Sequence, residues 1–378
     1  MTAVLHLTSW YRNPWNQLEA PFIKEHFDAL HGRVRQELWH VQVRDDGPGL
    51  KWRCGQTSEV ERYAVFFAPL PSGRAVEWLT LLLLIFVRLR LGRRWWDVVN
   101  VHVAYPLLRF PKLFRWLFGP KVVITEHWSA YHRGFNLAPA NPGRRRIAEI
   151  FHHNIPVVAV SQALLTDIVR FAGTDRFPKH VVPNVVDPRL FFPSASTPKT
   201  FGPICLMVAS WAPIKRPLLA MAAFAKMLSR WPSAQLRVIG GGQQLPAMKE
   251  FVHRAKLEQH IVFLGPRDKA AVASEMRSAD LFLHPSEYET FSVVCAEALC
   301  SGLPVIASNV GGIPEFVDKT NGLLVENTDK AWTEALERAF SEISKWDRVT
   351  IAESARDLFA PAVVGSRLRH IYISHTAR

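Results

Sequence analysis

Few cysteines and the lack of any long apolar run are the first features of this sequence. Its four cysteines, Cys54, Cys205, Cys295 and Cys300, form no Cys-x-x-Cys pair. A disulfide framework and a structural zinc site are therefore not indicated, and because we find no signal-peptide pattern we expect a cytoplasmic protein. The longest apolar run, Trp78 to Val87, has ten residues, against the roughly 20 of a membrane-spanning helix. We expect no transmembrane segment.

The sequence also lacks low-complexity tracts and obvious internal repeats. Its 378 residues are 48% hydrophobic and 21% charged, a composition typical of a folded protein and not of a disordered one. The chain is too long for one ordinary domain and fits two of roughly 150 to 200 residues.

Negative charge is scarce in the first half of the chain. Residues 1–200 hold 26 Lys and Arg against 15 Asp and Glu, and also nine of the thirteen tryptophans, whereas residues 201–378 hold 20 against 18. A basic, aromatic half suits an anionic partner such as a membrane surface or a phosphate-bearing substrate. Ordinary basic solubility explains the same imbalance equally well.

The segment Leu107–Lys121 mixes bulky apolar residues with cations, and Pro111 argues against a long regular helix. Its cations are Arg109, Lys112, Arg115 and Lys121. Such a segment suits an anionic membrane, with its basic side chains reaching lipid headgroups. A core-facing helix with a basic exterior fits the same pattern.

Short apolar runs alternate with helix-capable segments throughout the chain, which predicts two parallel sheets of βα units. In the second half these runs are nearly continuous, as expected of strands buried on both faces. The predicted strands lie in residues 3–10, 96–103, 121–127, 155–161, 203–210, 234–242, 260–266, 279–286 and 303–308.

A stretch rich in turn-forming residues separates the two sets of strands. Val181 to Pro203 contains five prolines and few periodic apolar positions, so we place a linker there. Two doubly wound α/β domains joined in this way are expected to face each other across a cleft, at the carboxyl ends of their strands, where such sheets bind ligands.

One carboxylate stands in an otherwise apolar segment. Residues 292–300, SVVCAEALC, predict a short buried helix that ends before Gly302 and Pro304. Burying an ionised carboxylate is costly, so Glu297 needs a ligand or a basic neighbour, and a Glu paired to a core Arg is the purely structural alternative. The start of this helix, from Thr290 to Ser292, offers backbone N–H groups to phosphate oxygens.

The segment EYETFSVVCAEALCSGLPVIASNVGGIPEFV, residues 287–317, resembles the signature of glycosyltransferase family 4. In that family two glutamates separated by seven residues flank an aromatic residue and a short helix. The resemblance implies that Glu297 binds the ribose of a nucleotide-sugar and that Glu289 binds the transferred sugar. It also implies that the backbone of Thr290, Phe291, Ser292 and Val293 holds the sugar and the phosphate.

The segment MVASWAPIKRPLLAMAAFAKM, residues 207–227, resembles the family's strand, loop and helix with a diphosphate-binding lysine, which maps to Lys215. A cation there would stabilise the charge that develops on the leaving group. The family usually has an arginine five residues earlier. Here that position is Ser210, and Arg216 is the candidate substitute.

Three weaker similarities complete the implied sugar-donor site. Gly241 and Gly242 match the family's glycine-rich turn, although the chain has no G-x-G-x-x-G fingerprint there. Pro266 and Arg267 match the segment whose backbone contacts the nucleotide base. His127, at the end of a predicted strand, matches a histidine close to the donor sugar; a structural role is the alternative.

The first half supplies the candidates for binding the acceptor. His102 ends a predicted strand and is assigned to the acceptor side. The N-terminal loop has no glycine where many relatives have a glycine-rich loop, and its aromatic rings suit stacking on sugar faces; packing against the next helix is equally compatible. The loop candidates are Trp10, Tyr11, Arg12, Trp15 and Asn16.

The resemblance implies a GT-B fold: an N-terminal acceptor-binding domain at 1–185, a linker at 186–200, and a C-terminal nucleotide-sugar domain at 201–359. A final helix at about 360–378 packs back on the first domain. The implied activity is that of a retaining hexosyltransferase with His127, Lys215 and Glu289 as catalytic residues, acting on a glycan or lipid-linked acceptor in surface polysaccharide or lipopolysaccharide assembly.

No Asp-x-Asp sequence occurs in the chain, so we expect neither a metal nor another cofactor, and we expect no nucleic acid partner. Peripheral contact with an anionic membrane is a further expectation. The main alternative is a catalytically silent GT-B protein that binds nucleotide or polymer as a scaffold, and Ser210 is the residue that supports it.

Overall fold

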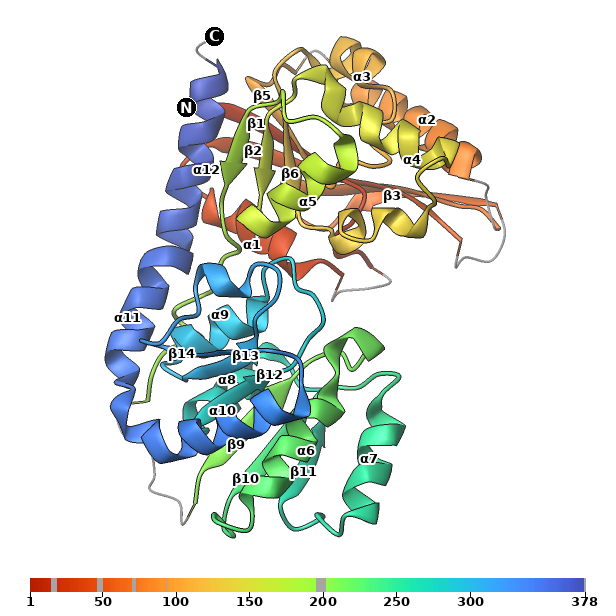
Figure 1. The fold of residues 1–378 in the computed structure, drawn as a ribbon. Helices are drawn as coiled ribbons and strands as arrows, with labels where there is room; N and C mark the ends of the chain where they lie inside the picture. The colour runs from red at the N-terminus through yellow and green to blue at the C-terminus, as the bar shows by residue number, and fades with distance from the viewer. Residues whose placement is uncertain (15–18, 46–49, 70–72, 93, 195–201, 377–378) are drawn as a thin grey trace. The chain divides into compact units, whose positions relative to one another are not determined.

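The computed structural model describes residues 1–14, 19–45, 50–69, 73–92, 94–194 and 202–376 (Figure 1). Trp15 and Asn16, two of the predicted acceptor contacts, lie outside these ranges. The chain divides into two units, one made of Met1–Val185 with Pro361–Arg378 and the other of Val186–Ala360. Each unit has its own sheet and its own core.

The first unit is built on an eight-stranded sheet in the order β3-β4-β2-β1-β5-β6-β7-β8, in which only β3 runs antiparallel to its neighbour. Its elements are β1 (Ala3–Thr8), α1 (Pro21–Ala29), β2 (Arg35–Arg44), β3 (Lys51–Gln56), β4 (Glu61–Phe67), α2 (Gly73–Leu91), β5 (Val98–His102), α3 (Pro111–Phe118), β6 (Val122–Glu126), α4 (Pro142–Ala148), β7 (Val157–Ala159), α5 (Gln162–Ala172), β8 (Lys179–Val181) and α12 (Pro361–Thr376).

The helix at the end of the chain completes the core of this first unit. Val364, Leu368 and Tyr372 of α12 are buried together with Val4 of β1 and Val98 of β5. Helix α12 also packs against α1. Burial of these side chains ties residues more than 260 positions apart in sequence into one core.

The second unit has a six-stranded, fully parallel sheet in the order β11-β10-β9-β12-β13-β14. Its elements are β9 (Ile204–Val208), a single turn of 3-10 helix η4 (Pro213–Lys215), α6 (Pro217–Met227), β10 (Gln235–Ile239), α7 (Leu245–Arg254), β11 (Ile261–Gly265), α8 (Lys269–Ser278), β12 (Leu281–His284), α9 (Val293–Cys300), β13 (Val305–Ser308), β14 (Gly322–Val325), α10 (Asp329–Glu342) and α11 (Arg348–Phe359).

Each of the nine predicted strand segments contains a strand, which confirms the two parallel sheets. Side chains of β9, β12 and β13 are buried along their whole length, as expected of strands covered on both faces. Five strands were not predicted. Strand β3 is mostly exposed and forms an antiparallel edge with β4, and β8 and β14 have only three and four residues, too few for an apolar period to show.

The segment Leu107–Lys121 contains a short helix in spite of Pro111. That proline is the first residue of α3, a position where the missing N–H has no intrahelical partner and the fixed φ suits the helix. The long helix α2 carries the apolar run Trp78–Val87. Within the described ranges, no helix combines the length and the apolarity required to cross a bilayer.

Candidate active site

The second unit gathers three of the predicted site segments around Glu289. Lys215 ends η4, and its Nζ donates to Glu289 Oε1. His284, the last residue of β12, places its Nε2 2.8 Å from the same oxygen and 3.2 Å from Ser292 Oγ. The structure therefore brings Lys215, Glu289 and Ser292 together, as the sequence predicted, and adds His284.

Burial and two neighbouring side chains act in opposite directions on the pKa of Glu289. Burial, the largest single influence, raises the pKa of its carboxyl, but the charge of Lys215 and the hydrogen bond from His284 outweigh it and lower the pKa to about 2. Glu289 is thus a carboxylate at any physiological pH, with the Lys215 side chain beside it. The side chain of Glu289 is 12% exposed.

A network of hydrogen bonds to the backbone fixes the loop that carries Glu289. The N–H of Glu287 donates to the carbonyl of Ile214 (2.8 Å), one residue before Lys215. Ser286 N–H donates to Ser308 Oγ (2.9 Å), and Asn327 Nδ2 donates to the Ser286 carbonyl (2.8 Å). These bonds hold Lys215 and Glu289 in one fixed arrangement.

A glycine turn clamps the other side of this loop. Gly312 N–H donates to the Glu289 carbonyl at 3.0 Å. Gly311 has a φ of +55°, and a Cβ there would collide with the same carbonyl oxygen. Only glycine satisfies both requirements at position 311 without strain, which explains the first glycine of the Gly-Gly pair in the sequence signature.

Glu297 lies in the middle of α9 and is 5% exposed. Its Oε1 is 3.5 Å from Nζ of Lys269, the first residue of α8. The basic neighbour that the sequence required is therefore present, and it is a half-exposed lysine and not a core arginine. The purely structural account of Glu297 gains this support, while its predicted contact with a ribose stays a prediction.

The start of α9 has the backbone geometry of a tight turn. Ser292 precedes the helix with φ 75° and ψ 81°. The Phe291 side chain is buried, with its ring centroid 5.0 Å from that of Phe316 and 5.5 Å from that of Phe359. Phe291 thus anchors the turn in the core.

Ser210 and the glycine turn lie side by side. Trp211 N–H donates to the Gly241 carbonyl at 2.8 Å, and a Cβ on Gly242 would collide with the Trp211 backbone. Gly241 also lies against Pro266, since a Cβ there would be 3.6 Å from the proline ring. Ser210 is exposed, whereas Trp211 is 2% exposed.

Arg216, the candidate substitute for the missing arginine, lines a different hollow. This hollow of about 450 Å³ also includes Gln244, Glu287 and Asp329 and does not include Lys215 or Glu289 among its lining residues. Arg267 lies directly after Pro266 in the exposed turn before α8. The structure thus gathers Ser210, Gly241, Gly242 and Pro266. In the described part of the chain, the ion pairs of Glu289 are with Lys215 and His284, and Arg216 and Arg267 are not among them.

In the first unit, His127 and His102 belong to a buried histidine cluster with His6 and His26. The ring centroid of His127 lies 5.9 Å from that of His102 and 5.1 Å from that of His26, and His6 Nδ1 is 3.1 Å from His102 Nε2. Burial, with a contribution from neighbouring histidines, lowers the pKa of His127 and His102 well below the usual value. These imidazoles are neutral near pH 7.

Glu126, which the sequence reasoning missed, lies directly before His127. Its Oε1 accepts from the Tyr131 hydroxyl and the Ala104 N–H, both at 2.7 Å. Burial raises the pKa of Glu126 to about 7, although these hydrogen bonds oppose the shift. Its sequence signal is its position at the last residue of a buried parallel strand.

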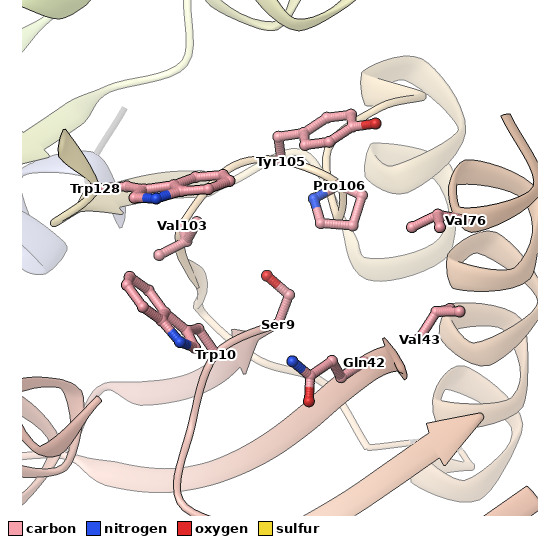
Figure 2. A pocket seen from close by; sticks show the side chains of 9 residues that line it. All are labelled: Ser9, Trp10, Gln42, Val43, Val76, Val103, Tyr105, Pro106 and Trp128. Atoms are coloured by element: carbon pink, nitrogen blue, oxygen red, sulfur yellow. The ribbon is translucent and has the colours of Figure 1, made fainter. Parts of the chain in front are cut away.

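The predicted loop contacts have different environments. Tyr11 is buried and donates to Glu61 Oε2 at 3.0 Å, and Arg12 Nη2 donates to the same oxygen at 3.0 Å. Trp10 instead lines a cavity of about 350 Å³, opposite Trp128 (Figure 2).

Among the described residues of the chain, no group of three or more His, Cys, Asp or Glu side chains has an arrangement that could hold a metal ion.

Comparison with known families finds two matches that adjoin each other. The model "Glycosyltransferase Family 4" matches residues 11–190, and the model "Glycosyl transferases group 1" matches residues 191–356.

Two curated relatives show what the chain is similar to in sequence. It is 34% identical to a D-inositol 3-phosphate glycosyltransferase of Corynebacterium kroppenstedtii over 42% of this chain and 37% of that protein. It is 27% identical to the N-acetyl-alpha-D-glucosaminyl L-malate synthase of Bacillus anthracis over 58% of each chain. The alignments thus span less than two thirds of these relatives' lengths.

Among solved structures, Anabaena HepE in complex with UDP matches 99% of this chain and 100% of its own, with a TM-score of 0.74 and 17% identity. Similarity at this level of identity shows the fold, which is the two-domain GT-B fold.

Proposed function

The chain belongs to the group 1 glycosyltransferases of family 4, and from this premise we propose that it transfers a sugar from a nucleoside-diphosphate sugar to an acceptor hydroxyl. The anomeric configuration is retained in this proposal, as in the family that the sequence resembles. The observation that carries the proposal is the cluster of Lys215, Glu289 and His284 beside the start of α9. Its geometry suits a sugar linked to a diphosphate.

The chemistry of the cluster follows from its charges. When the bond between the anomeric carbon and the diphosphate breaks, negative charge develops on the leaving oxygen. Lys215 supplies a fixed cation for that charge, and the backbone N–H groups at the start of α9 supply hydrogen bonds. Glu289 is ionised and is suited to accept hydrogen bonds from sugar hydroxyls. Glu297 is assigned to the ribose.

We propose that no metal ion takes part, because Lys215 and the helix start fill the role that a divalent cation has in other transferases. Full activity in excess EDTA is expected. Activity that disappears with EDTA and returns with Mn²⁺ would contradict this part of the proposal. The predicted role of His127 beside the transferred sugar stays a prediction.

The proposed acceptor is a hydroxyl of a glycan or a lipid-linked glycan in surface polysaccharide or lipopolysaccharide assembly, reached at the cytoplasmic face of an anionic membrane. Support comes from an exposed apolar and basic surface of the first unit. We call it the α2–α3 face and define it by Trp78, Leu82, Leu89, Trp95 and Trp116, which are 58%, 61%, 74%, 73% and 79% exposed.

Contacts join α2 to the residue before α3 and to the end of α3. Trp78, Leu82 and Leu89 follow a helical spacing that keeps them on one side of α2. The ring of Trp78 lies 4.9 Å from that of Phe110, just before α3. Arg88, Trp95 and Leu117 line a common hollow at the other end.

The charge of this surface is complementary to anionic lipid. In residues 73–92 and 107–121 the sole acidic residue is Glu77; it is buried and paired with Arg109 and Arg146. Exposed apolar rings beside cations are the pattern of proteins that bind to the surface of anionic bilayers.

A panel of UDP-, GDP- and ADP-sugars, scored for nucleotide release by the purified protein, tests the proposed activity. One sugar donor should be turned over, and Glu297→Ala should reduce nucleotide release by at least tenfold. Ser210, in the place of the family's arginine, favours the alternative of a catalytically silent binding protein. Nucleotide binding without any turnover across the panel would establish that alternative.

A further inference from the structure

The cavity of about 350 Å³ in the first unit has a size within the range of small-molecule sites. It lies where several strands of the eight-stranded sheet end, and α2 closes one side (Figure 2). Its lining residues are Ser9, Trp10, Gln42, Val43, Val76, Val103, Tyr105, Pro106 and Trp128. All of them belong to the first unit.

None of these nine described lining residues carries a charge. The charged groups bonded to the Gln42 and Tyr105 side chains are themselves paired. Gln42 is bonded to Glu19 and Arg44, which form an ion pair at 3.1 Å. The Tyr105 hydroxyl donates to Glu77 at 3.3 Å, and Glu77 is paired with two arginines. The cavity therefore offers flat apolar faces and a few neutral polar groups.

The two tryptophans of the cavity are held in place from behind. Their ring centroids lie 6.2 Å apart with planes tilted by 55°. Trp10 packs edge-on against Phe22 at 5.9 Å, and Trp128 packs edge-on against Phe135 at 4.8 Å. In Figure 2 both indoles border the same space, with the Ser9 hydroxyl between them and Tyr105. The site is built before any ligand arrives, which reduces the entropy cost of binding.

We propose that this cavity binds an uncharged sugar ring of the acceptor, with the packed Trp10 and Trp128 indoles forming one wall against an apolar face of the ring and Ser9 bonded to one of its hydroxyls. This inference rests on the proposed glycosyl transfer and names the chemical class of its acceptor. A pyranose has apolar C–H faces and polar edges, which match amphipathic indoles and a few polar groups.

A phosphate or a carboxylate does not suit this cavity, because an anion loses its hydration there and meets no cation among the described lining residues. The two curated relatives are named for D-inositol 3-phosphate and for L-malate, both of which are anions. The acceptor of this chain thus differs in charge from the compounds in those names.

Saturation-transfer NMR on the full chain, without any sugar donor, tests the inference. The neutral probes are methyl glucoside, methyl galactoside, methyl mannoside, maltose and lactose, and the anionic probes are glucose 1-phosphate and inositol 1-phosphate. Neutral probes are expected to receive saturation that is lost on removal of Trp10 or Trp128, and this Trp-dependent saturation should be at least tenfold less for the anionic probes at equal concentration. Octyl glucoside distinguishes binding of the sugar ring from binding of the lipid tail. Its ring protons, and not its octyl chain, should show the Trp-dependent signal.

Trp10→Ala and Trp128→Ala are each expected to weaken the binding of neutral probes about tenfold, because each variant removes one aromatic contact. Trp52→Phe is the matched control, since Trp52 lies on β3 outside the cavity. Val76→Arg gives a gain of function: a cation at this half-buried position should favour glucose 1-phosphate over methyl glucoside about tenfold relative to the wild type. This variant remains informative if the alanine variants fail to fold.

Three results would overturn the inference: no Trp-dependent saturation of any neutral probe, a Trp-dependent signal of the anionic probes as large as that of the neutral ones, or a Trp-dependent signal on the octyl chain alone. Nucleotide release from the sugar-donor panel is measured in the same samples. If neutral sugars bind but no sugar donor is turned over, the proposed function is wrong and the cavity assignment stands. If a sugar donor is turned over but neutral sugars do not bind, the cavity assignment is wrong and the proposed function stands.

Discussion

At the scale of single residues, opposite pKa shifts mark the two units. In the second unit Glu289 is held as a carboxylate by Lys215 and His284 against the effect of burial, and its pKa is about 2. In the first unit burial dominates, so that the pKa of Glu126 rises to about 7 and the pKa of His127 falls well below its usual value. Perturbed groups of this kind gather at functional sites.

Lys215→Met is expected to reduce sugar transfer about 10² to 10³-fold, because the leaving diphosphate loses its fixed cation. Loss of Lys215 should also raise the pKa of Glu289 from about 2, which carboxyl NMR at acidic pH can measure. Lys226→Met, at an exposed position of α6, is the matched control and should leave both measurements unchanged. An unaltered transfer rate in Lys215→Met would exclude the role proposed for the lysine.

Glu126→Gln is expected to alter how stability depends on pH. The folded-state pKa of Glu126 is raised from 4.5 to about 7, so the folded state binds more protons between these values and stability falls as pH rises from 4.5 to 7. Glutamine removes this titration. Relative to the wild type, the variant should gain up to about 3 kcal/mol in unfolding free energy between pH 4.5 and pH 8.

Urea denaturation at a series of pH values measures this difference, and Glu258→Gln, at an exposed position, serves as the control. A difference between Glu126→Gln and the wild type that stays constant with pH would show that Glu126 titrates in the usual acidic range in the folded protein.

At the scale of elements, helix α2 contributes side chains both to the cavity and to the α2–α3 face. Helix α2 places Val76 in the lining of the cavity, and Glu77, beside it, fixes the first turn through Tyr105, Arg109 and Arg146. Trp78, Leu82 and Leu89 on its outer side belong to the α2–α3 face. A helix that is apolar on both sides explains why the run Trp78–Val87 exists without spanning a membrane.

The triple variant Leu82→Gln, Leu89→Gln, Trp116→Ser is expected to lose binding to vesicles that contain phosphatidylglycerol. Three exposed apolar side chains contribute a few kcal/mol of insertion energy, so flotation should fall at least tenfold. Binding of the wild type should also weaken as salt is raised, because the cations of the face are screened.

Val349→Gln with Leu358→Gln is the matched control, since both are exposed apolar residues of α11 in the second unit. Flotation of the wild type with neutral vesicles and anionic vesicles alike, or with neither, would remove the electrostatic basis of the membrane contact.

At the scale of the whole molecule, the two units differ in how the chain builds them. The second unit is one continuous segment, Val186–Ala360, whereas the first needs residues from both ends of the chain. Val364, Leu368 and Tyr372 of α12 fill the core beside β1 and β5. Removal of α12 therefore exposes apolar surface in the first unit.

Residues 186–360 expressed alone should fold cooperatively, because that unit has its own sheet and core. Residues 1–185 alone should be less stable by several kcal/mol than the first unit within the full chain, since at least three large buried side chains are lost. Thermal unfolding followed by circular dichroism measures both. A cooperative and equally stable 1–185 fragment would show that α12 contributes little to the core.

The sequence by itself determined the family, the two parallel sheets and the position of the second-unit cluster. Near-continuous apolar runs predict strands buried on both faces, and the spacing of Glu289, Glu297 and the Gly-Gly pair identifies the signature, because these features are local in the chain. Short or exposed strands such as β3, β8 and β14 escaped prediction because their pairing partners, and not their own pattern, make them strands.

Only the tertiary structure decided which side chains meet. His284 joins Lys215, 69 positions away in sequence, because β12 and β9 pair in one sheet. Lys269 meets Glu297 because α8 packs against α9, and Trp10 meets Trp128 because β1, β5 and β6 end at the same edge. Contacts across parallel strands and packed helices depend on the whole fold, so no local pattern in the sequence carries them.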